Sequence, residues 1–164
     1  MIKQKPIKTK DIENEIVSLY DMRKHDIVPR VGWGLNIHEC DLLILSKSGY
    51  ATEVEIKISS GDLKKDADKN HKHSSRRIKE LYFAIPLKLL KFRHFIPKHA
   101  GIYIIYWDRY KLKCRKMRNA KINRDAIKFS PELRYKLARL GLMRYWNQRL
   151  KETNTWDFDQ GEGI

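Results

Sequence analysis

Three charged side chains share one face of a predicted strand in the segment ATEVEIKIS, residues 51–59. Because side chains alternate along a β-strand, Glu53, Glu55 and Lys57 fall on one face and Val54 with its apolar neighbours on the other. Burying two carboxylates and an ammonium group costs several kcal/mol unless they are paired or bind a metal. A strand built for packing alone would avoid this pattern, which therefore indicates chemistry.

A further carboxylate, Asp41, stands at the start of the apolar run CDLLILS, which the turn sequence SKSGY follows. The two runs predict a hairpin, and neighbouring strands lie about 4.8 Å apart, so Asp41 can lie near Glu55. Two carboxylates at one place suit Mg²⁺, which keeps several waters and leaves room for a phosphate oxygen. We expect Mn²⁺ to substitute for it.

Such an ion lowers the pKa of a bound water and neutralises charge on a phosphate under attack. Lys57 lies on the same face, two residues after Glu55. It would orient or help deprotonate the attacking water, or stabilise the pentacovalent phosphorus. The residues thus predict hydrolysis of a phosphodiester.

The charge of the chain indicates a polyanionic partner. Its 164 residues include 35 Lys and Arg against 20 Asp and Glu, a formal net charge of +15, and residues 109–151 alone hold 15 basic and 2 acidic residues. Nucleic acid is the commonest partner for such a field. Charge alone also leaves open an anionic membrane surface or an acidic protein. Contacts to phosphates give affinity without sequence preference.

The elements that must position these residues follow from hydrophobic periodicity and turn signals. They predict one α/β domain over residues 1–151, with a mixed sheet flanked by helices and a basic C-terminal helix, followed by a flexible acidic tail over 152–164. The predicted helices cover residues 11–23, 60–80, 87–97 and 130–151, and the strands fall within 25–59, 80–86 and 101–107, with a further strand at 111–118.

In this order, Asp41 followed by Glu55-Ile56-Lys57 resembles the D…(D/E)xK signature of the PD-(D/E)xK nuclease superfamily. The proline that usually precedes the aspartate is replaced by Cys40. The resemblance implies a restriction-endonuclease-like fold and a metal-dependent endonuclease. The segment IENEIVSLY is similar to the opening helix of archaeal Holliday-junction resolvases, which implies that Glu13, with Glu15 as the alternative, completes the acidic cluster. Acids are also common in the first turn of any helix.

Residues 10–108 further resemble the MmcB-like DNA repair proteins, through the segments ECDLLIL, EVEIKISSGDLKKDADK, LYFAIP and GIYIIYWD. In that group the ExK strand runs into a helix start of the Ser-x-x-Asp type, which matches Ser59, Asp62, Asp66 and Lys69. We therefore expect a Mg²⁺-dependent deoxyribonuclease of DNA repair, recombination or restriction. The basic residues that we expect to contact DNA are Lys69, Arg76, Arg77, Arg115, Lys116, Arg118, Arg134, Arg139 and Arg144.

Other interpretations remain open. A non-catalytic DNA-binding subunit with the same fold, or an RNA-directed nuclease, would carry the same charge. Glu53 would be either a second-metal ligand or the partner of a surface lysine, and we favour the lysine. The histidines His38, His71 and His73 match no standard zinc spacing.

Two cysteines, Cys40 and Cys114, are too few for a disulfide scaffold, and no signal-peptide pattern opens the chain. We expect a cytoplasmic, nucleoid-associated protein, whether its gene is chromosomal, plasmid-borne or phage-borne. No membrane segment and no small-molecule cofactor are predicted, and a homodimer is left open.

Overall fold

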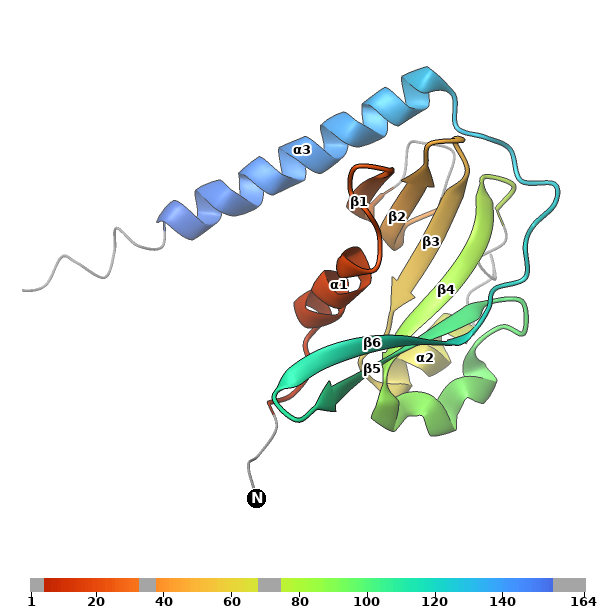
Figure 1. Ribbon diagram of the computed structural model, residues 1–164, viewed down its shortest axis with the longest axis vertical. Coiled ribbons are helices and arrows are strands. Elements are labelled where there is room, and N and C mark those ends of the chain that lie inside the picture. Colours follow the sequence, from red (N-terminus) through yellow and green to blue (C-terminus); the bar gives the residue numbers. More distant parts are fainter. Residues whose placement is uncertain (1–4, 33–37, 68–74, 155–164) are drawn as a thin grey trace, which may run out of the picture.

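The computed structural model describes residues 5–32, 38–67 and 75–154, and it contains one six-stranded mixed sheet. The strands lie side by side in sequence order (Figure 1). The first three and the last two pair antiparallel, whereas β3, β4 and β5 run parallel. Their bounds are β1 His25–Val31, β2 Cys40–Ser46, β3 Ala51–Ile56, β4 Ile78–Pro86, β5 Gly101–Asp108 and β6 Lys111–Arg118.

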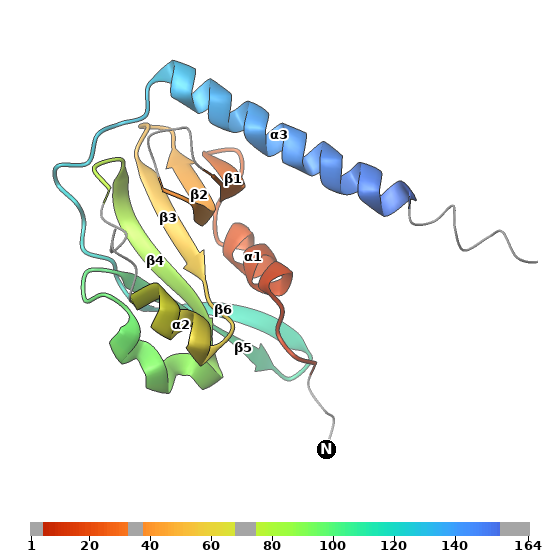
Figure 2. The same cartoon turned by 180° about the vertical axis from the view of Figure 1, so that it is seen from behind.

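Helices cover both faces of this sheet. Helix α1, Thr9–Ser18, inserts Ile12 and Ile16 into an apolar cluster that includes Val54 of β3. On the opposite face, α2, Ser60–Ala67, and the 3₁₀ helix η1, Leu87–Phe95, pack together against β4 and β5 (Figure 2). The long helix α3, Pro131–Asn154, lies along the edge strand β1 and extends past α1.

The predicted class, a mixed sheet flanked by helices, is confirmed. The hairpin after Asp41 forms as expected, with Gly49 at φ 86°, a left-handed conformation that glycine adopts without steric cost. Strand β6 pairs with β5, so the further strand that the sequence suggested is present. Ser130 Oγ accepts the backbone N–H of Leu133 and so caps the start of α3.

Several predicted boundaries are wrong. Residues 78–80 belong to β4 and not to the helix before it, because Ile78 packs in the core beside Ala51. The segment 87–97 forms a 3₁₀ helix instead of an amphipathic α-helix, and Leu89 is its single fully buried residue. Helix α1 ends at Ser18, and α3 runs on to Asn154, beyond the predicted end of the domain.

None of the helices in the described ranges combines the length and the apolar composition that a bilayer span requires.

Candidate functional site

The charged face of β3 is buried at the centre of the sheet. Exposed fractions are 0% for Glu53, 3% for Glu55 and 9% for Lys57, while Val54 and Ile56 point into the cluster around α1. Strand β3 lies between β2 and β4, and helices pack against both faces of the sheet. The alternation predicted from the sequence is therefore correct. Contacts with other charged side chains offset part of the cost of burying these groups.

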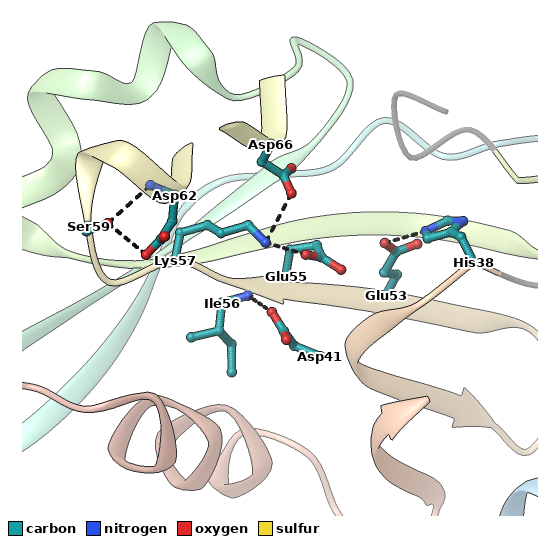
Figure 3. A network of polar contacts seen from close by, with 9 residues as sticks. All are labelled: His38, Asp41, Glu53, Glu55, Ile56, Lys57, Ser59, Asp62 and Asp66. Atoms are coloured by element: carbon teal, nitrogen blue, oxygen red, sulfur yellow. Dashed lines mark hydrogen bonds and ion pairs between the residues drawn. The ribbon is translucent and has the colours of Figure 1, made fainter. Parts of the chain in front are cut away.

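Lys57 joins two carboxylates from different elements. Its Nζ lies 2.6 Å from Oε2 of Glu55 and 3.1 Å from Oδ1 of Asp66, a buried residue of α2 (Figure 3). Burial alone would lower the pKa of Lys57, but the two negative charges outweigh it and hold the pKa above its usual value. Lys57 is thus a fixed ammonium group in a largely dry site.

One carboxylate oxygen of Glu55 makes no hydrogen bond within the described residues. Burial raises the pKa of Glu55, against the lowering effect of Lys57, and the nearby charge of Asp41 raises it further. Its Oε1 atom is buried and has no hydrogen-bond partner within the described residues. A buried carboxylate oxygen without a partner is costly. It is therefore a natural ligand position for a cation.

Asp41 reaches β3 from the neighbouring strand. The pair Leu42–Val54 in the β2–β3 ladder places Asp41 opposite Glu55, as the hairpin predicts. Its Oδ2 atom accepts the backbone N–H of Ile56 at 2.7 Å (Figure 3). This bond fixes one carboxylate oxygen against the end of β3 and leaves the other available to a ligand.

Of the two acids proposed on α1, Glu13 is the one close enough to Asp41 for their charges to interact. Burial raises the pKa of Glu13, Arg30 lowers it, and the charge of Asp41 raises it again. Glu15 instead lies near β6, where burial and then the charge of Glu15 raise the pKa of Cys114. Within residues 5–32, 38–67 and 75–154, however, no three or more His, Cys, Asp or Glu side chains already form a metal-binding cluster.

Among the described residues, Glu53 contacts a histidine and not the surface lysine that we favoured. Its Oε1 lies 2.7 Å from Nε2 of His38, and both side chains are almost fully buried (Figure 3). No local pattern predicts this pair, because the two residues are 15 apart and belong to different segments. His38 is thus engaged with a carboxylate, while His71 and His73 of the zinc reading lie outside the described residues.

The turn after β3 sets the position of Asp66. Ser59 Oγ accepts the backbone N–H of Asp62 at 3.1 Å and donates to the Asp62 carboxylate at 2.7 Å, which caps the start of α2. Leu63 anchors the helix in the cluster under η1. Asp66, one turn beyond Asp62, therefore faces Lys57. The sequence marked Asp66 only through the resemblance and gave it no role.

Among the residues predicted to contact DNA, Lys69 lies outside the described ranges. Arg76, Arg115, Lys116 and Arg139 are exposed. Four arginines also bond other parts of the chain: Arg77 donates to the carbonyl of Lys128, Arg118 to those of Ala100 and Pro97, Arg134 to that of Lys47 and to the Asp26 carboxylate, and Arg144 to the carbonyl of Pro29.

No protein-family model matches the chain, and no curated protein matches it in sequence. Among solved structures, a protein of unknown function from Silicibacter pomeroyi is similar, with a TM-score of 0.58 and 17% identity over 99% of each chain. At this identity the likeness shows a shared fold over the whole length and carries no information about chemistry.

Proposed function

We propose that the protein is a Mg²⁺-dependent deoxyribonuclease of the PD-(D/E)xK type, with a restriction-endonuclease-like fold. The observation that carries the proposal is the buried face of β3, where Glu55 and Lys57 lie beside Asp41 of β2. Strands β2 and β3 form a hairpin, and α2 begins shortly after Lys57. Glu13 of α1 supplies the fourth residue.

The donor set fits a hard divalent cation. Mg²⁺ takes one or two protein carboxylates and completes its shell with water and substrate oxygens. Glu55 contributes a buried oxygen with no partner among the described residues, and Asp41 contributes the oxygen not bonded to Ile56. Glu13 would join them directly or through a water. When bound, the ion would supply an acidified water and charge neutralisation at the phosphate.

Lys57 acts in this proposal as an electrostatic group. Because two carboxylates raise its pKa, it carries its proton at neutral pH and is poorly suited to act as a base. Its ammonium group would donate to a non-bridging phosphate oxygen, where negative charge grows during in-line attack by water. Asp66 holds that ammonium group from α2, and the Ile56 N–H holds Asp41.

Burial of the acids favours this function over a binding-only module. Glu53, Glu55 and Asp66 are all at most 5% exposed, and charges this deep in a fold are costly to keep. A surface that bound DNA through phosphates alone would need basic residues and no buried carboxylates. A nuclease acting on RNA would share the same chemistry, so the substrate must be tested directly.

The test is cleavage of labelled single-stranded, duplex, flapped and four-way-junction DNA, and of the matching single-stranded RNA, with Mg²⁺, with Mn²⁺ and with EDTA. Asp41→Ala and Lys57→Ala should each lower the rate by about 10²-fold or more. Lys98→Ala, which removes an exposed lysine after η1, serves as the matched control. Metal-dependent cutting lost only in the site variants supports the proposal, whereas binding without cutting in any metal refutes it.

A further inference from the structure

A basic cleft lies between α1 and α3, beside the proposed site. Its volume is about 610 Å³, and its lining includes four cations, Lys10, Arg30, Arg144 and Lys151, with one acid, Glu13. The acid is the residue of α1 whose pKa responds to Asp41. The cleft therefore opens next to the carboxylates and carries the opposite charge.

Arg30 connects the cleft to the site through the sheet. In the β1–β2 ladder, Pro29 pairs with Leu42 and Val31 with Cys40, which leaves Arg30 opposite Asp41. Arg30 has φ 49°, a left-handed conformation that costs a side-chain-bearing residue about 1 kcal/mol or more. Such strain is often found at ligand-binding positions.

Two cations of the cleft, Arg30 and Arg144, form no ion pair within the described residues. Arg30 makes no hydrogen bond and no ion pair within the described residues, although it lies close enough to Glu13 to lower that pKa. Arg144 donates to the carbonyl of Pro29, and burial and then the charge of Arg30 lower its pKa. Two neighbouring guanidinium groups that repel each other gain most from an anion placed between them.

The dimensions of the cleft fit a nucleic acid strand. Arg144, Asn147, Gln148 and Lys151 are spaced along one face of α3, over a helix length of about 10 Å. One strand of duplex DNA advances about 3.4 Å per nucleotide, so this face can follow two or three phosphates. Exposed Lys10 pairs with Glu152 across the end of the cleft at 3.5 Å, a contact that solvent weakens.

We propose that this cleft binds the phosphodiester backbone next to the scissile phosphate, with Arg30 and Arg144 holding the nearest phosphate and Lys10 and Lys151 the next. The inference rests on the proposed function and adds the path that the bound DNA strand follows. The strand passes between α1 and α3 and enters the site over Glu13 and Asp41.

The test is binding of labelled duplex and single-stranded DNA in EDTA, by fluorescence anisotropy at several salt concentrations. The cleft variant is Lys10→Gln with Arg30→Gln, and Lys151→Gln is a second variant at an exposed position. The control, Lys91→Gln with Lys98→Gln, removes the same charge on the η1 side, away from α3 (Figure 1). Thermal unfolding confirms that each variant is folded.

The double cleft variant should bind duplex about tenfold more weakly, and its salt slope should fall by about 2 because two phosphate contacts are lost. Lys151→Gln should lower the slope by about 1, and the control should change neither quantity. If the cleft and control variants weakened DNA binding equally, binding would depend on the overall positive charge of the protein, and the cleft site would be overturned. Wild-type protein that cuts DNA while both cleft variants bind normally would also overturn it, but would leave the nuclease intact. If wild-type protein neither binds nor cuts DNA, the proposed function falls as well.

Discussion

The ammonium nitrogen of Lys57, the residue directly after β3, lies 2.6 Å from Oε2 of Glu55 within that strand. Side chains at this spacing share a face, so the strand itself brings the pair together. Asp66 of α2 approaches the same nitrogen from the far side. The pair is thus held in one arrangement by two separate elements, which is the pre-organisation that electrostatic catalysis requires.

Removal of Asp66 should alter the chemistry of Lys57 without removing the lysine. The Asp66 carboxylate helps to raise the pKa of Lys57, so Asp66→Asn should lower that pKa and release the side chain. We expect cleavage to fall by about tenfold, and the loss of activity at high pH to begin at a lower pH. The pH dependence of single-turnover cleavage measures this. The control is Asp125→Asn, which changes an exposed aspartate. If the pH dependence of Asp66→Asn matched that of this control and of wild type, Asp66 would have no role in tuning Lys57.

His38 should stabilise the fold through Glu53. Their 2.7 Å contact is nearly solvent-free, so His38→Ala should lower the free energy of unfolding by about 2 to 3 kcal/mol. Urea unfolding measures the change, with His94→Ala, an exposed position on η1, as control. In a Glu53→Gln background the loss should shrink, because the buried charge is gone. Equal losses in both backgrounds would show that the pair is not coupled.

Glu13 should make the stability of the protein depend on pH. Its pKa is raised in the folded state, so the fold binds the proton more tightly than the unfolded chain. The stability that this proton contributes is fully present below the unfolded pKa, near 4.5, and is lost as pH rises through the folded pKa. Glu13→Gln should therefore be more stable than wild type at pH 7, and the difference should shrink toward pH 4. Thermal unfolding of both proteins across this pH range measures the difference. If Glu13→Gln were less stable than wild type at pH 7, Glu13 would instead be part of a stabilising ion pair.

Local patterns predicted most of the site. Alternation placed Glu55 and Lys57 on one face, and the turn at Gly49 fixed the hairpin that brings Asp41 to them. The Ser-x-x-Asp segment from Ser59 to Asp62, which the resemblance marks as a helix start, lies where α2 begins. Each of these signals acts over a few residues, so the sequence contains it directly.

The parts that the sequence did not reveal depend on distant contacts. His38 meets Glu53 only because the chain before β2 returns to the centre of the sheet. Arg30 faces Asp41 because of the β1–β2 register, which no local pattern fixed. The 3₁₀ helix η1 lies between Pro86 and Pro97. The spacing of its leucine and phenylalanine residues is also compatible with an α-helix, so periodicity alone did not distinguish the two helix types. The choice of Glu13 over Glu15 likewise required the packing of α1 on the sheet.

The central claim is that Asp41 and Glu55 together hold a divalent cation, and Mn²⁺ binding tests it most directly. The free ion is measured by EPR during titration of wild type, Asp41→Asn and Glu55→Gln, with Glu132→Gln, an exposed acid of α3, as control. We predict saturable binding in wild type and control, and affinity at least about tenfold weaker in each site variant, because a carboxylate ligand is lost. Binding that is absent from wild type, or equal in all four proteins, would contradict the account.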